Sequence, residues 1–187
     1  MSQFVEQLRK TIDDYTEPFM DEKACYDKAR LKPGYAYNEE LAEAICHSAC
    51  MVVVYVPKYE RHDYCVREFH AMEMIEQKRK TAVGAGVLGN RRMIIPIILR
   101  ADLEKGLPGL IKNFIQYCDF TKYTTAKPDF RRNSGYVQKV DEVAHTIYEI
   151  YDRLQQPDPC TECNQFRLPP APLIQGLPLQ PFPRPTP

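Results

Sequence analysis

The sequence predicts an α/β domain built on a parallel, doubly wound sheet. Two runs rich in β-branched and other apolar residues, 51–56 and 93–99, have the length and composition of strands buried on both faces. Segments with apolar residues at helical spacing lie before, between and after these runs. This alternation predicts a parallel sheet, because parallel strands need long crossover connections that are usually helices.

The N-terminal part of the chain is predicted to contain two helices. Apolar residues recur at helical spacing over 3–15, which predicts the first helix. A weak strand candidate follows at 23–27. The Pro-Gly pair within 29–35 is a turn signal, so this segment is predicted to be a loop. Asn38 is then a good N-cap for a helix that ends near Cys46.

The remaining elements follow the first buried strand. Asp63 is a plausible N-cap for a helix over 64–78, which has an apolar stripe. The Gly-rich segment 84–89 lacks the spacing of a phosphate-binding loop and is interpreted as a connector before strand 93–99. A last strand is predicted over 114–120. The closing helix covers 136–154, with an apolar face formed by Val140, Val143, Ile147, Ile150 and Leu154.

Composition divides the chain into a domain over 1–155 and a tail over 156–187. Ten of the 16 prolines lie in the tail, which carries few charges. We expect such a segment to be disordered and partly polyproline, because it buries too little surface to offset chain entropy. The tail also contains a lone CxxC (Cys160 and Cys163), a weak signal for zinc or redox chemistry on its own.

Charge and cysteine content limit the class of protein. The 25 basic and 25 acidic residues balance, so no basic surface for nucleic acid is predicted. The longest apolar runs are far shorter than the roughly 20 residues of a membrane span. The seven cysteines are odd in number and follow no export signal, so we expect thiols in a reducing cytoplasm.

The order of several short motifs resembles that of a Toll/interleukin-1 receptor (TIR) domain of the bacterial type. The resemblance extends over about residues 4–154. It rests on YDKARLKPG at 26–34 with NEEL at 38–41 (the BB loop and following helix), AICHS at 44–48 ("AI..S"), PKY at 57–59 ("SP.Y"), YCVRE at 64–68 ("WC..E") and IIPII at 94–98 (the fourth strand). Val56 stands where the family usually has serine, and Tyr64 stands where it has tryptophan but keeps an aromatic face.

The resemblance implies a flavodoxin-like sheet with strand order 2-1-3-4-5. The family begins with a strand and loop before its first helix, whereas this chain begins at that helix. We therefore expect an N-terminally truncated TIR fold, and either a natural chain that starts upstream or poor stability without the central first strand.

Catalytic members of the family are NAD+ nucleosidases, which hydrolyse the bond between nicotinamide and ribose. By resemblance, Glu68 is the catalytic residue, and Tyr64 stacks on the substrate. Nicotinamide is already a cationic leaving group, so a single carboxylate that stabilises the oxocarbenium-like ribose suffices. Arg30, Tyr35 and Tyr37 are further candidates for binding NAD+, which is a substrate; no cofactor and no metal are expected.

The resemblance also implies partners. The loop formed by Arg30, Leu31, Lys32, Pro33 and Gly34 is expected to contact other TIR domains, and the protein is expected to self-associate. By resemblance, such proteins act in the cytoplasm in signal transduction for innate immunity, defence or cell death. The product would be ADP-ribose or its cyclic form.

Several alternatives stay open from the sequence alone. Glu68 could be a solvated glutamate favoured by the helix dipole, and Arg30 and Lys32 could belong to a solvated loop. The domain could be a non-catalytic protein-interaction module, or a relative of nucleoside 2-deoxyribosyltransferases, against which the BB-like loop argues. His62 and His70 flank Glu68 without the spacing of a metal-binding motif.

Overall fold

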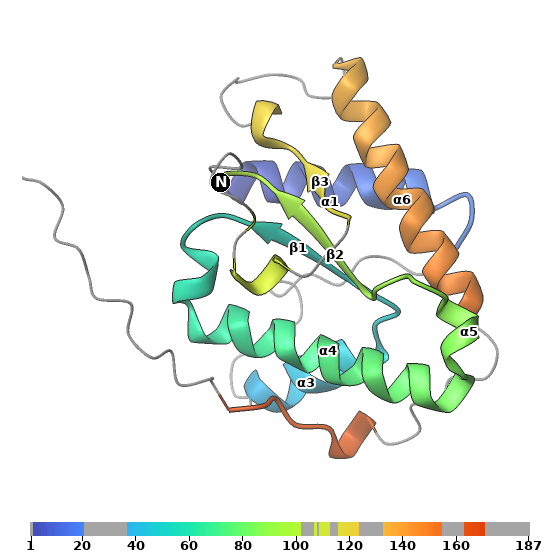
Figure 1. Cartoon of the computed structure of the whole chain (residues 1–187). Helices are drawn as coiled ribbons and strands as arrows, with labels where there is room; N and C mark the ends of the chain where they lie inside the picture. The colour runs from blue at the N-terminus through green and yellow to red at the C-terminus, as the bar shows by residue number, and fades with distance from the viewer. Residues whose placement is uncertain are drawn as a thin grey trace, which may run out of the picture.

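The structure, a computed structural model, has three parallel strands at its centre (Figure 1). It describes residues 2–20, 37–101, 107, 109–112, 116–123, 133–154 and 163–170. Within these residues the sheet has the order β1-β2-β3, formed by β1 (Met51–Tyr55), β2 (Ile94–Ile98) and β3 (Cys118–Asp119). A parallel sheet in which α4 lies between β1 and β2 in the chain agrees with the predicted doubly wound, flavodoxin-like class.

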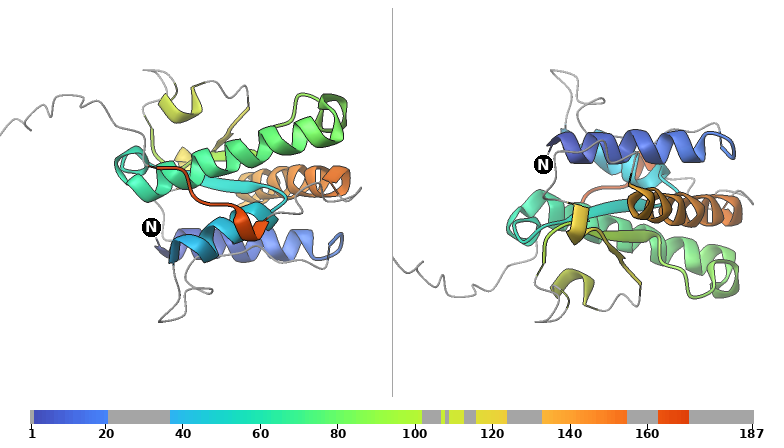
Figure 2. Two further views of the ribbon diagram at one scale, coloured as in Figure 1. Left: turned by 90° about the horizontal axis from the view of Figure 1, so that it is seen from below. Right: turned by 90° about the horizontal axis from the view of Figure 1, so that it is seen from above.

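Helices cover both faces of this sheet. Figure 2 shows the strands between α4 on one side and α1 on the other, with α6 running along α1. The bounds of the helices are α1 Ser2–Thr16, α3 Tyr37–His47, α4 Asp63–Val83, α5 Ala85–Leu88 and α6 Ser134–Leu154. Single 3-10 turns are η1 Tyr59–Arg61, η3 Gly109–Ile111, η4 Thr121–Tyr123 and η6 Cys163–Gln165.

Strand burial follows position in the sheet. All five residues of β2 are buried, as predicted, because β2 has a neighbour on each edge. The expectation of full burial is wrong for β1, in which Met51, Val52 and Val54 are only half-buried. In the described part of the chain β1 pairs with β2 alone, in parallel register from Met51 opposite Ile94.

Helix α1 and helix α6 close one side of the core. Phe4, Leu8 and Ile12 of α1 are buried, as their spacing predicts. Phe4 makes edge-on ring contacts with Phe120 and with Tyr136 of α6, at centroid distances of 6.5 and 6.4 Å. These contacts join the beginning of the domain to its last helix.

Several element boundaries differ from the prediction. Helix α3 begins one residue before Asn38, and α4 begins at Asp63 itself, preceded by His62 as its N-cap. Helix α4 runs to Val83 rather than to residue 78, and ends where Gly84 takes a φ of +84°, a backbone conformation that favours glycine. The predicted connector at 84–89 contains the short helix α5, whose Leu88 is fully buried.

The predicted last strand is shorter in the structure. Only Cys118–Asp119 pair with β2, and residues 113–115 lie outside the described part of the chain. The strand candidate at 23–27 and the loop at 29–35 also lie outside it. Helix α6 agrees with the prediction, and all five residues of its expected apolar face are buried.

Part of the expected disordered tail is packed against the domain. Residues 163–170 begin with η6, and Cys163, Phe166 and Leu168 are buried in the core. The expectation of disorder is therefore wrong for these eight residues, because two large apolar side chains and a covalent bond hold them in place. The rest of the tail lies outside the described residues.

The covalent bond is a disulfide between Cys46 of α3 and Cys163. Their Cα atoms are 5.5 Å apart, and 117 positions separate them in the sequence. This corrects the expectation that all cysteines are thiols. Cys50, Cys65 and Cys118 are thiols, whereas Cys25 and Cys160 lie outside the described residues.

Candidate functional site

The candidate site lies at the carboxyl edge of the parallel sheet, where β1 leads into α4. Strand β1 ends at Tyr55, and η1 follows before α4 begins at Asp63 (Figure 1). Strands β1 and β2 are joined at this edge, since the backbone N–H of Leu99 donates to the carbonyl of Tyr55 at 3.0 Å. Open α/β sheets bind ligands at this edge.

Glu68 lies in the second turn of α4 and is half-buried. The phenol of Tyr59 is close to it. Burial raises the pKa of Tyr59, and electrostatic interactions with Cys65 and Glu68 raise it further. The Tyr59 hydroxyl donates to the carbonyl of Cys65 at 3.1 Å, which fixes η1 against the first turns of α4. Tyr59 therefore stays neutral beside a carboxylate.

Tyr64 lies one helical turn before Glu68 and presents its ring to solvent. Half of its surface is exposed (50%), a large value for an aromatic residue. The Arg67 guanidinium lies 5.7 Å from the centre of the Tyr64 ring, within the range of a cation–π contact. The structure thus places the exposed Tyr64 ring and the half-buried Glu68 carboxylate on adjacent turns of one helix.

Two polar groups at this edge were missed by sequence reasoning. Burial, and then the charge and hydrogen bond of Glu60, raise the pKa of Tyr55 to about 12. The Glu60 carboxylate also accepts a hydrogen bond from the backbone N–H of Leu110 at 2.9 Å, which ties η1 to η3. Glu60 follows the PKY motif, but nothing in its local sequence distinguishes it from a surface glutamate.

A third carboxylate, Asp119, ends β3. Burial alone would raise its pKa, but hydrogen bonds from the Thr121 hydroxyl (2.7 Å) and backbone N–H (2.9 Å), with the charges of Lys139 and Lys122, hold the pKa below its usual value. Asp119 is therefore an ionised group that stabilises the turn into η4. An Asp followed two residues later by Thr was the available signal for this turn.

The other predicted site residues fall mostly outside the described part of the chain. Arg30, Leu31, Lys32, Pro33, Gly34 and Tyr35 all lie there. Tyr37 is the first residue of α3, and the position of its side chain is not described. The roles predicted for these residues in binding NAD+ or another TIR domain remain predictions.

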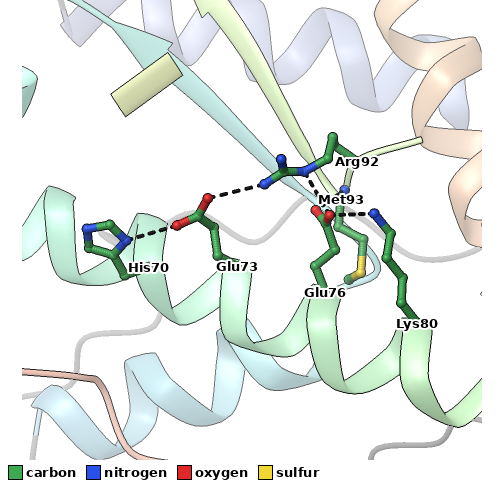
Figure 3. Close-up of polar contacts among 6 residues, drawn as sticks. All are labelled: His70, Glu73, Glu76, Lys80, Arg92 and Met93. Atoms are coloured by element: carbon green, nitrogen blue, oxygen red, sulfur yellow. Dashed lines mark hydrogen bonds and ion pairs between the residues drawn. The ribbon is translucent and has the colours of Figure 1, made fainter. Parts of the chain in front are cut away.

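A network of charged residues extends from His70 to Lys80 along α4 and ties this helix to the residues just before β2 (Figure 3). The buried Glu76 accepts a hydrogen bond from the backbone N–H of Met93 at 2.8 Å and forms ion pairs with Arg92 and Lys80, each at 2.7 Å. Glu73 links Arg92 (3.2 Å) to His70 (2.9 Å). His70 thus belongs to a structural network.

The motif order and the parallel sheet agree with the comparison with protein families. A model of the TIR domain matches residues 2–133 of the 187-residue chain. The chain belongs to the TIR domain family. Searches of curated proteins and of solved structures found no significant match.

The match to the TIR domain covers the elements that form the candidate site. The match includes α1, all three described strands and the whole of α4 with Glu68. It ends just before α6, which completes the core around Phe4 and Tyr136. None of the helices in the described residues has the length and hydrophobicity that a bilayer span requires.

Proposed function

We propose that this TIR domain is an NAD+ nucleosidase that releases nicotinamide and leaves ADP-ribose or its cyclic form. The observation that carries the proposal is the position of Glu68, a half-buried carboxylate in the second turn of α4 at the carboxyl edge of the sheet. Its neighbours supply the other parts expected of such a site: an exposed ring on Tyr64 and a neutral phenol on Tyr59.

The chemistry requires little more from the protein. As nicotinamide departs, positive charge develops on the ribose, and the Glu68 carboxylate would stabilise that charge. The Tyr64 ring would stack on a flat part of NAD+, and Arg67, positioned over that ring, would lie near the pyrophosphate. Water or a ribose hydroxyl then completes the reaction, which gives the linear or the cyclic product.

The proposal includes where and how the protein acts. As a TIR domain it would act in the cytoplasm, through self-association with other TIR domains, in signal transduction for defence or cell death. The loop formed by residues 30–34 is the proposed contact with a second TIR domain. Association would raise the activity, so the assay needs a high protein concentration.

The test is to incubate the protein with NAD+ and follow the release of nicotinamide. Glu68→Gln removes the charge with little change in shape, and we expect the rate to fall at least about 100-fold. Glu43→Gln is the matched control, because Glu43 is an exposed carboxylate of α3 whose side chain is 58% accessible. Release that persists in Glu68→Gln would show that another group is catalytic.

A second candidate function is a non-catalytic TIR interaction module. Val56 favours it, because this buried apolar residue (9% exposed) stands at the strand end where the motif usually places a serine hydroxyl. The same assay separates the two candidates. No release from the unchanged protein at any concentration, together with self-association in analytical ultracentrifugation, would support the module.

A further inference from the structure

The C-terminal strap, residues 163–170, lies against α3 and α4 on the outside of the domain. Figures 1 and 2 show it, coloured red, crossing beside these two helices. Its η6 turn packs on α3, and its later residues reach α4. The proposed NAD+ hydrolysis makes no use of this segment.

The strap is attached at one end by a covalent bond and elsewhere by weak contacts. The disulfide joins Cys163 to Cys46. Phe166 and Leu168 are buried, and the Lys78 ammonium lies 5.7 Å from the centre of the Phe166 ring. Near the other end, Arg67 Nε donates a hydrogen bond to the carbonyl of Pro169 at 2.7 Å.

These weak contacts offset only part of the entropy lost when eight residues are fixed. Within the strap, the backbone N–H of Phe166 donates to the carbonyl of Cys163 at 3.2 Å, and the strap belongs to no strand of the described sheet. Asn164, Gln165, Arg167 and Pro170 are exposed. Without the disulfide, docking of the strap would depend on two apolar side chains and two contacts with α4. The disulfide keeps the strap at a high effective concentration against α3.

A fixed positive charge lies next to the backbone of Cys46, because Arg79 Nη2 donates to the backbone carbonyl of Cys46 at 2.9 Å. Burial raises the pKa of the nearby Cys50 thiol to about 12, and the positive charge of Arg79 offsets only part of this effect. Cys50 therefore remains a thiol and does not compete for the disulfide.

We propose that the Cys46–Cys163 disulfide is a redox-modification site that holds the strap on α3 and α4 and releases it when reduced by a dithiol. The dithiol supplies two electrons and two protons: its own sulfurs form a disulfide, the Cys46–Cys163 bond breaks, and both cysteines become thiols. Disulfides of cytoplasmic proteins are usually catalytic or redox-sensing, so this inference draws on the proposed location and not on NAD+ hydrolysis.

Release of the strap changes the surface beside the candidate site. Arg67 loses its hydrogen bond to Pro169, and this is the guanidinium that lies over the Tyr64 ring. Phe166 and Leu168 leave the core, which exposes the apolar surface that they cover. The redox state of one disulfide thereby controls a surface that reaches Tyr64.

The first measurement maps the bond in the full chain. Alkylation followed by trypsin under denaturing, non-reducing conditions should yield residues 31–58 joined to residues 154–167. A Cys160→Ser background assigns the second sulfur to Cys163. After treatment with dithiothreitol or a thioredoxin-type dithiol, the two peptides should separate and each carry alkylated cysteines. Absence of the joined peptide from oxidised protein would overturn the proposal.

The second measurement follows release of the strap by brief trypsin treatment of the native full chain. The bond after Arg167 lies inside the strap, and we expect it to be cleaved at least about 10-fold faster after reduction. Cys46→Ser should be cleaved at the fast rate in both redox states. Cys50→Ser, the matched control, should respond to reduction as the unchanged protein does.

A circular-dichroism melt separates release from unfolding, since the reduced protein and Cys46→Ser should keep a cooperative transition. Complete reduction of Cys46 and Cys163 with no change in cleavage after Arg167 would contradict the proposed release of the strap. The disulfide would then be a purely structural bond. Equal acceleration at sites throughout α4 and α6 would also contradict it, because the whole domain would then have opened.

Discussion

Arg79 of α4 donates a hydrogen bond to the backbone carbonyl of Cys46, with a distance of 2.9 Å between Nη2 and the oxygen. A second bond of 2.7 Å runs from Nη1 to the carbonyl of Ser48. These carbonyls belong to the C-terminal end of α3, where a helix has unpaired acceptors and a partial negative charge. A buried arginine, only 3% exposed, thus joins two helices.

Replacing Arg79 by alanine should therefore destabilise the domain. We expect the free energy of unfolding to fall by about 2–4 kcal/mol, because one buried and one partly buried carbonyl lose hydrogen bonds to a charged donor. Gln77→Ala, an exposed position on the same helix, is the control and should change it by less than about 0.5 kcal/mol. Urea denaturation measures both, and similar values would contradict the role given to Arg79.

The two glutamates of the network in Figure 3 should differ in their contribution to stability. Glu76→Ala leaves the Met93 N–H and the charges of Arg92 and Lys80 without the buried carboxylate, and should cost about 3–5 kcal/mol. Glu73→Ala should cost about 1 kcal/mol or less, since Glu73 is one-third exposed and solvent screens its ion pairs. Thermal unfolding of the two variants provides the comparison. A larger loss of stability in Glu73→Ala than in Glu76→Ala would contradict the prediction.

Asp119 should contribute to stability at neutral pH and lose that contribution in acid. Its pKa in the folded state is lowered from 3.8, so the folded state favours the ionised carboxylate. The contribution is complete above its unfolded-state pKa and disappears as the pH falls through the lowered folded-state value. Because Asp119 is partly exposed, we expect about 1 kcal/mol at most.

The measurement is the pH dependence of urea denaturation between pH 2 and 6 for the unchanged protein and for Asp119→Asn. The variant should be less stable near pH 6, and the difference should vanish near pH 2. Asp141→Asn, at an exposed position of α6, should follow the unchanged protein. A constant difference at all pH values would mean that the charge of Asp119 is not involved.

Tyr64 should affect substrate affinity more than the chemical step. If NAD+ stacks on its exposed ring, Tyr64→Ala should raise KM roughly 2- to 10-fold, the effect of losing one aromatic contact. Tyr64→Trp should keep the unchanged value, because the larger ring offers the same flat face. Initial rates of nicotinamide release across a range of NAD+ concentrations give both constants. A fall in kcat alone for Tyr64→Ala would contradict stacking of NAD+ on this ring.

Local patterns predicted the helices and the central strand well. The spacing of Val140, Ile147 and Leu154 depends only on helical geometry, and all three side chains are buried in α6. The strand at 114–120 was predicted too long, because the extent of a strand depends on where its neighbour offers partners. Ile97 and Ile98 are the residues of β2 that pair with it.

The candidate site was predicted in part. A motif placed Glu68 and Tyr64 correctly on α4, since both lie within one helix whose start was visible in the sequence. Glu60 was missed because its partner is a backbone N–H 50 residues away, whereas the local signal for Asp119, a Thr two residues later, was available but not used. The Cys46–Cys163 bond was missed because disulfide pairing depends on the folded arrangement of distant segments.

The packing of α1 against α6 also determines the order in which the domain can form during synthesis. Phe4 and Leu8 leave the ribosome before Tyr136 and Val140, which lie on the helix that packs along α1 and follow more than 120 residues later. Their contact has a large sequence separation, which slows folding. The apolar face of α1 therefore stays uncovered by α6 through most of translation, and a nascent chain that ends before α6 is a natural substrate for a chaperone.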